Sequence, residues 1–389
     1  MSFNMVSVTS LADVGLVYGD VYLNYNFGRG HPLNPYRYKL FFDLVKSYGL
    51  LDKVRHVEPR MAGVEELKLI HEDSYIERVK KLSERGYGML DFGDTPAFKG
   101  MYEASCFIVG GTLNAVDMVM RGECTHAFNP GGGHHHAARD RGAGFCVFND
   151  VAIAVKYLLE KWGVKRVMVV DIDVHHGDGT QWSLYSEPRA LKVDFHESGM
   201  YLYPGTGFMD EMGEGEGYGF MVNIPLPPRT HNEAYLYAFK EIVPPLAEAF
   251  KPDVIVQQSG VDTHFEDPLA HLALTTQAYS EIADVMHEVA HKYAGGKYVM
   301  VGGGGYNVET VARGWTIMLS RLLGVELPDE LPSSWIEEFK QVMGYEPPKT
   351  LHDEAKPFIS EGTWRSVMAD VEQLVKQVKK RLSQFFKVE

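Results

Sequence analysis

Four apolar segments rich in β-branched residues recur along the middle and C-terminal parts of the chain. They lie at 165–173, 190–196, 253–262 and 297–306, and each is bounded by polar or turn-forming residues. Continuous apolar runs of this length, without alternating polar positions, are typical of strands that are buried on both faces of a parallel sheet.

Between these segments, apolar residues recur at spacings of three and four, which predicts helices. The expected helices cover 149–162, 232–250, 275–293, 308–323 and 363–386, the first with Asn149 as its N-cap. The alternation predicts one α/β domain over 1–389, with a mostly parallel sheet, helices on both faces and a C-terminal helical segment, 324–389, packed on it. In such sheets, sites form where the strands end.

Charge and cysteine content narrow the function classes. The formal net charge of −14 is unfavourable for nucleic-acid binding, because affinity for phosphates comes from Lys and Arg. No run of 18 apolar residues predicts a membrane span, and residues 1–19 lack the pattern of a signal peptide. Three scattered cysteines cannot form a disulfide framework. We therefore expect a cytoplasmic protein.

The segment Val169–Gly179, VVDIDVHHGDG, carries the densest group of polar residues behind a predicted strand. Asp171, Asp173 and His175 are spaced by two, so in an extended strand they project to one side. Two carboxylates and an imidazole suit a divalent metal, and Asp262, at the end of the predicted strand 253–262, could be a third protein ligand. Three protein ligands plus water is the pattern of a catalytic zinc site.

Two glycine-rich segments add further chemistry. Three histidines follow a glycine run within Asn129–Cys146, and neutral histidine is the usual general base near pH 7. Asp171 and Asp178 are candidate partners that would set their pKa. In Val301–Asn307, VGGGGYN, the glycines leave room for a substrate and Tyr306 presents one hydroxyl, which suits an oxyanion hole. Neither segment has a nucleotide-binding pattern.

Over about residues 16–323, these motifs and their order resemble the zinc-dependent histone deacetylase family, most closely its prokaryotic acetoin-utilisation branch. The matching motifs are GRGHPLNPYR, GDTP, GGGHHHA, GFCVFND, DIDVHHGDG, PGTG, DTHFEDPL and GGGGY. The resemblance implies the arginase–deacetylase fold and the hydrolysis of the acetamide of N6-acetyl-lysine in proteins, with release of acetate.

The resemblance also implies residue roles. Catalysis falls to His135, His136, Asp171, Asp178 and Tyr306, and metal binding to Asp173, His175 and Asp262. The residues implied to bind substrate are Arg37, Asp94, Gly144, Phe145, Tyr203, Leu269 and Gly304. Of these, Asp94 is expected at the rim, Arg37 near an acetate pocket, and Gly144, Phe145, Tyr203 and Leu269 at the acyl-lysine tunnel. His134 stands where many relatives have leucine, so a catalytic role is not expected for it.

Several alternatives remain open. One zinc ion per chain is expected, with iron(II) as the alternative in the cell, because the DxHxxD spacing differs from the DxHxD of two-manganese arginases. A structural potassium ion is a further expectation, although Asp194 replaces a family serine near that site and Tyr203 replaces a frequent phenylalanine. The substrate is an acetylated protein or, alternatively, a small acetylated amine such as an acetylpolyamine. A non-catalytic acyl-lysine binder is disfavoured, because no catalytic residue is missing.

Overall fold

A single eight-stranded sheet organises the computed structural model, which describes residues 14–387. Its strand order is β2-β1-β3-β8-β7-β4-β5-β6, and every pairing is parallel. The strands are β1 Val14–Val17, β2 Arg55–Val57, β3 His126–Asn129, β4 Val167–Asp171, β5 Ala190–Glu197, β6 Met221–Leu226, β7 Val254–Gln258 and β8 Tyr298–Val301. Most of the segment on which the signal-peptide prediction rests, residues 1–13, lies outside the described residues.

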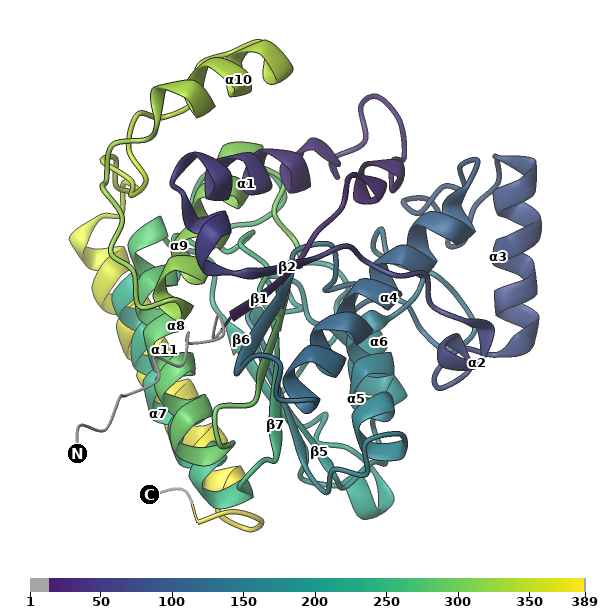
Figure 1. The fold of residues 1–389 in the computed structure, drawn as a ribbon. Helices are drawn as coiled ribbons and strands as arrows, with labels where there is room; N and C mark the ends of the chain where they lie inside the picture. Colours follow the sequence, from purple (N-terminus) through teal and green to yellow (C-terminus); the bar gives the residue numbers. More distant parts are fainter. Residues whose placement is uncertain (1–13, 388–389) are drawn as a thin grey trace, which may run out of the picture.

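Helices cover both faces of the sheet, with α4 and α5 on one face and α7, α8, α9 and α11 on the other (Figure 1). The helices are α1 Tyr36–Ser47, α2 Val64–Leu67, α3 Asp73–Arg85, α4 Met101–Met120, α5 Asp150–Glu160, α6 Asp178–Ser183, α7 Asn232–Phe250, α8 Thr276–Tyr293, α9 Val308–Leu322, α10 Ser333–Met343 and α11 Glu361–Leu382. The predicted α/β class with a parallel sheet is confirmed. Within residues 14–387, no helix is long and apolar enough to span a membrane.

The strands are apolar throughout because both of their faces are covered. In β4, Val167 and Val169 pack against α4 and α5, whereas Met168 and Val170 belong to the larger core on the opposite face. Asn149 caps α5 as predicted, since its side chain accepts a hydrogen bond from Ala152 N.

The strands end earlier than the apolar pattern predicts. β4 ends at Asp171, so the premise that Asp173 and His175 belong to an extended strand is wrong. The reason lies in the hydrogen bonds of the backbone. Beyond Asp171, Val174 N donates to a carboxylate oxygen of Asp262 at 2.8 Å, and His175 N donates to Asp173 at 3.0 Å. Carboxylates thus replace the neighbouring strand as acceptors, and the chain bends into the site.

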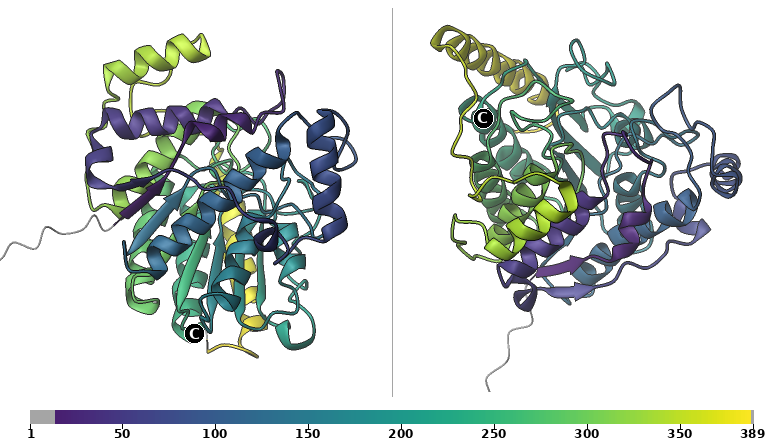
Figure 2. Two further views of the ribbon diagram at one scale, coloured as in Figure 1. Left: turned by 45° about the vertical axis from the view of Figure 1, so that its right-hand side comes forward. Right: turned by 90° about the horizontal axis from the view of Figure 1, so that it is seen from above.

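The C-terminal segment contains two helices that contact different parts of the body. α11 lies along α7 and contacts β6, with Val371 and Val375 buried. α10 contacts α1, where the indole N–H of Trp335 donates to the Leu40 carbonyl at 2.8 Å. Figure 2 shows α10 across α1, away from α3 on the other side of the molecule.

Candidate active site

Three buried side chains beyond the ends of β4 and β7 converge on one point. The Nδ1 atom of His175 lies 3.2 Å from Oδ1 of Asp173 and 3.0 Å from Oδ2 of Asp262. Ligand atoms that share a tetrahedral zinc at about 2.0–2.1 Å are roughly 3.3 Å apart. The donor types and their spacing therefore fit a divalent metal ion.

The remaining carboxylate oxygens of this group are held by other residues. Oδ2 of Asp173 accepts hydrogen bonds from the Gln258 side chain and from Gly304 N, both at 2.7 Å. Oδ1 of Asp262 accepts from Val174 N at 2.8 Å. Such outer contacts fix the direction of each ligand and keep one oxygen of each carboxylate facing the shared point.

Gly304 is where the backbone approaches the ligands most closely. A Cβ atom at this position would lie 1.9 Å from Oδ2 of Asp262 and 2.8 Å from Oδ2 of Asp173. Any side chain would therefore displace a ligand oxygen. The glycine run after β8 thus makes room for the ligands, in addition to the room for substrate that its sequence predicts.

Electrostatics favour a cation at the shared point. Burial disfavours the charged form of His175, but the hydrogen bonds that its ring donates to Asp173 and Asp262 outweigh this effect and raise its pKa to about 10. Burial also raises the pKa of Asp262, to about 8. The buried carboxylates thus need positive charge between them, and a divalent metal would provide it in place of a proton.

Two histidines beside this group are each held by a carboxylate. His135 Nδ1 lies 2.9 Å from Oδ2 of Asp171, and His136 Nδ1 lies 2.7 Å from Oδ1 of Asp178. Their Nε2 atoms are 3.1 Å apart, so both rings point the same way. These contacts are the predicted pairs, His135 with Asp171 and His136 with Asp178. His134 packs its ring against Tyr25 at 4.7 Å instead.

The two histidines differ in protonation. Burial opposes the charge on His135, but the carboxylates of Asp171 and Asp173 outweigh it and raise its pKa to about 9. For His136, burial and the neighbouring positive charge of His135 dominate and lower the pKa to about 4, against the effect of Asp178. His136 is therefore the neutral ring near pH 7 and the better proton acceptor.

A cavity of about 190 Å³ leads from the surface to His136 and His175. Its wall brings together the predicted tunnel residues and the predicted rim residue, with Leu202 added: Asp94, Gly144, Phe145, Leu202, Tyr203, Leu269 and Tyr306. Burial and the nearby Asp91 raise the pKa of Asp94 to about 6. Behind the metal ligands lies a second cavity of about 20 Å³, lined in part by Arg37.

Phe145 stands in the tunnel wall in a left-handed backbone conformation, with φ of 66°. Hydrogen bonds stabilise it, because its carbonyl accepts from the Tyr25 hydroxyl at 2.6 Å and its N–H donates to Thr95 Oγ1 at 3.1 Å. The preceding Gly144 is required, since a Cβ there would lie 2.4 Å from the His136 ring. This strained turn places the aromatic ring of Phe145 in the same cavity wall as His136.

Arg37 and Tyr306 are both held by hydrogen bonds to buried groups of the protein. Arg37 is buried and donates to the Gly305 carbonyl at 3.0 Å. The Tyr306 N–H donates to Oδ2 of the buried Asp267 at 2.8 Å, which holds the backbone of the tyrosine in place. Sequence reasoning missed Asp267, which lies inside the matched DTHFEDPL motif, and Gln258, whose only signal is its place at a strand end.

Sequence reasoning also missed Lys192 on β5. Its buried ammonium pairs with Asp194 and lies 3.9 Å from Oδ2 of Asp171, the carboxylate that holds His135. Asp194 also contacts His196 Nδ1 at 2.7 Å. A single lysine in an apolar strand gives no sequence signal that it contacts these carboxylates. The positively charged side chain of Lys192 thus lies next to Asp171, behind His135.

Comparison with known proteins agrees with this geometry. The model of the histone deacetylase domain matches residues 31–322, three quarters of the chain. The chain belongs to the histone deacetylase family. It is 43% identical over 340 residues to the acetoin utilization protein AcuC of Bacillus subtilis (strain 168), covering 85% of this chain and 87% of that protein. To the AcuC protein of Staphylococcus xylosus it is 39% identical over 381 residues, covering 95% and 98%.

These relatives make the chain an acetoin-utilisation-type member of the family and a hydrolase of the deacetylase class. Family members are generally metal-dependent, and Asp173, His175 and Asp262 form one of the groups in the described chain that could hold an ion. The family expected from the motifs is confirmed.

Proposed function

We propose that this deacetylase hydrolyses the acetamide of N6-acetyl-lysine in proteins, with one zinc ion held by Asp173, His175 and Asp262. One observation supports the proposal: His175, which shares the metal-ligand group with Asp173 and Asp262, and the neutral His136 both line one cavity of about 190 Å³. Phe145, Tyr203 and Leu269 form its apolar wall, which suits the methylene stem of a lysine with its acetamide next to His175 and His136.

The roles follow from the contacts. A bound zinc ion would lower the pKa of a water molecule and polarise the acetamide carbonyl. His136, neutral and oriented by Asp178, takes the proton of the attacking water and then gives it to the leaving lysine amine. His135, charged and paired with Asp171, stabilises negative charge that develops nearby.

Tyr306 supplies the remaining hydrogen-bond donor. Burial and the carboxylates around it keep the pKa of Tyr306 well above its usual value, so the hydroxyl holds its proton. A protonated hydroxyl at the tunnel end can donate to the oxygen of the tetrahedral intermediate. Its backbone bond to Asp267 makes the donor pre-organised, so little reorganisation is needed during the reaction.

The tunnel wall is suited to the lysine stem. Phe145 and Tyr203 offer aromatic faces, and each buried methylene contributes about 0.8 kcal/mol of binding free energy. We assign Asp94 at the rim to the substrate backbone, as the resemblance implies. Gly144 and Leu269 complete the wall of this passage, and Gly304 lines the small inner cavity. Arg37 lies at the inner cavity, which is large enough for about one water molecule and suits the acetate side of the reaction.

Lys192 bears on the potassium expectation. Its ammonium is paired with Asp194 and lies near Asp171. We propose that this ammonium replaces the structural potassium ion expected beside Asp194. The deacetylase rate should then be the same in potassium and in sodium buffers of equal ionic strength. A Lys192→Met variant should become slower, and a rate that then rises selectively with potassium would show the exchange of one cation for the other.

The alternative substrate is a small acetylated amine. Exposed apolar side chains near the rim favour a protein: Phe92 lies two residues before Asp94, and Met200 and Tyr201 lie just before Tyr203. Residues that flank an acetyl-lysine could pack on this surface, whereas an acetylpolyamine has no such residues. The acidic net charge suits either cationic substrate.

A side-by-side assay tests the assignment. Purified protein loaded with zinc should release acetate from acetyl-lysine peptides with a higher kcat/KM than from acetylated polyamines, and chelation should abolish both activities. Loading with iron(II) in parallel shows which metal supports the faster reaction. A higher kcat/KM on acetylpolyamines would reverse the substrate assignment, and activity that survives exhaustive chelation would remove the metal from the mechanism.

A further inference from the structure

Three histidines gather at the opposite end of the sheet from the catalytic residues. His126 is the first residue of β3, and His287 and His291 lie on α8. The ring centroids of the three are 4.7–4.9 Å apart, and one ligand nitrogen from each lies within 4.8 Å of the others. Among the described residues, this is the second group with metal-ligand geometry.

The spacing of the two helical histidines directs both toward the strand. Residues four apart lie on the same face of a helix, so His287 and His291 present their rings side by side to His126. The Nε2 atoms of His126 and His291 are 3.2 Å apart. This is close to the roughly 3.3 Å that separates two nitrogens bound to one tetrahedral ion.

A second imidazole faces the buried ring of His126, since its Nε2 atom lies within hydrogen-bond distance of Nε2 of His291. Two imidazole nitrogens at this distance share either one proton or a bound ion. The Nδ1 atom of His126 has no hydrogen-bond partner and lies on the other side of the ring, so an ion at Nε2 would leave it unchanged. His287 is half-buried and His291 exposed, so an ion can reach the group from solvent.

The charges around the group do not oppose a cation. Arg321 of α9 lies near His287, but its guanidinium is paired with Asp284 of α8 at 2.6 and 2.7 Å. The imidazoles are otherwise bordered by Tyr298, whose ring packs against His126. The guanidinium near the group is therefore already neutralised by a partner of its own.

From this geometry we propose that His126, His287 and His291 bind a second divalent transition-metal ion, with water completing the coordination. Imidazole ligands suit zinc, nickel and copper, whereas magnesium prefers oxygen. The ion would join α8 to β3. Because α8 leads directly into β8, which pairs with β3, it would bind the helix to the centre of the sheet. Its role is structural, at a distance from the deacetylase chemistry.

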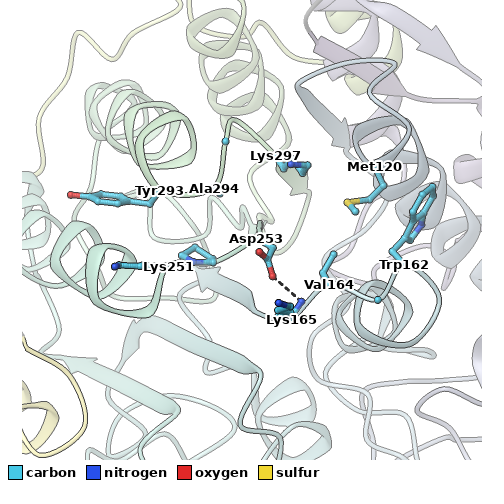
Figure 3. A pocket seen from close by; sticks show the side chains of 12 residues that line it. Met120, Trp162, Val164, Lys165, Lys251, Asp253, Tyr293, Ala294 and Lys297 are labelled. Atoms are coloured by element: carbon cyan, nitrogen blue, oxygen red, sulfur yellow. Dashed lines mark hydrogen bonds between the residues drawn. The ribbon is translucent and has the colours of Figure 1, made fainter.

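An open pocket of about 560 Å³ lies near this end but is not the site. Figure 3 shows Lys165, Lys251 and Lys297 around it, with Asp253 accepting a hydrogen bond from Lys165 N. Three lysines would repel a divalent cation. The turn from Tyr293 to Lys297 borders this pocket and follows the helix that carries the two surface histidines.

Metal counting tests the proposal. The chelator-treated parent and a His287→Asn/His291→Asn double variant are titrated with Zn²⁺, and bound metal is measured after gel filtration. The parent should bind one equivalent more than the double variant, whatever the catalytic site holds. Both altered residues reach the surface, so the fold should survive, and circular dichroism checks it. Deacetylase activity at saturating zinc should be equal in the two proteins.

Two controls make the outcome decisive. A His56→Asn/His352→Asn variant removes two histidines elsewhere and should bind as much zinc as the parent. Magnesium should add no equivalent to either protein. Zinc should also raise the melting temperature more in the parent than in the double variant. Equal zinc content in parent and double variant would overturn the proposal, as would loss of an equivalent in the control variant.

Discussion

The two ends of the sheet place polar side chains under different constraints. Beyond the carboxyl ends, Asp173 and Asp262 are buried, and each keeps a fixed orientation through a second hydrogen-bond partner. At the amino ends, His126 is buried with one nitrogen unpartnered, and the neighbouring pocket is open and lined by lysines. The difference shows what catalysis requires: a metal site alone needs converging ligands, whereas a catalytic one needs every ligand and proton carrier held by its neighbours.

The largest effect should follow removal of a catalytic ligand. Asp173→Ala removes one metal-binding oxygen and leaves the Gln258 amide and Gly304 N without their acceptor. Activity should fall by about 10³-fold or more, since the metal supplies several kcal/mol of transition-state stabilisation. Metal analysis should show the loss of one equivalent, while a second equivalent at His126 remains.

Gly304→Ala tests whether the orientation of the proposed metal ligands matters, because it removes none of them. The added methyl group would overlap Oδ2 of Asp262, so zinc content and activity should fall together. An alanine variant with full zinc content and normal activity would show that the ligands can move aside, and that the carboxyl end is less rigid than its contacts indicate.

His136→Ala separates proton transfer from metal binding. The loss of a general base typically costs about 10²–10⁴ in rate, and zinc content should stay near that of the parent. His134→Leu is the matched control two residues earlier on the chain. Its Nε2 atom is buried without a partner, so leucine removes an unsatisfied polar atom and should be tolerated. Equal damage from both variants would contradict the assignment of His136.

Tyr306→Phe should have a somewhat smaller effect. Removal of one oxyanion donor costs about 10²–10³ in kcat, whereas KM should change little because the tunnel wall is retained. The measurement is kcat and KM with zinc content checked. Near-normal kcat would mean that the Tyr306 hydroxyl contributes nothing that the metal does not already supply.

The smallest effect should come from an alanine at the amino end. Gly163 lies between α5 and β4 with φ of 65°, and nothing lies within 4 Å of a Cβ built there. Gly163→Ala should therefore cost only about 1–2 kcal/mol of stability through its left-handed backbone. Activity should be unchanged. A loss of activity comparable to that of Gly304→Ala would show that the two ends are coupled.

The sequence was most informative where pattern and chemistry coincide. Apolar runs identified β4, β5, β7 and β8, because strands buried on both faces are apolar throughout. The strands β1, β2, β3 and β6 were not predicted. β2 is largely exposed at the edge of the sheet, and the other three interrupt their apolar residues with Gly15 in β1, His126 and Asn129 in β3, and Asn223 and Pro225 in β6. The strand ends were also misplaced: apolar residues such as Ile172 remain buried after the chain has left the sheet.

For the site, motifs pointed to the candidate ligands and to the histidine pair, which the fold brings together, but not to the residues that contact them. Gln258, Asp267 and Lys192 act through three-dimensional contacts with residues 39 to 85 positions away, or across neighbouring strands. Their types and spacings are ordinary in sequence. Such supporting residues become visible only when the fold brings distant carboxylates to the same place.

The position of α11 has a consequence for the solubility of the protein. α11 contacts β6, the edge strand of the sheet, and just beyond the helix Phe386 packs on Phe220 and Phe250. Uncovered sheet edges invite pairing with other chains and aggregation. A chain shortened before Glu361 would keep every proposed catalytic residue and yet expose this apolar border. Such a shortened protein should therefore aggregate although its proposed active site is intact. Shortened forms designed for crystallisation should keep this helix.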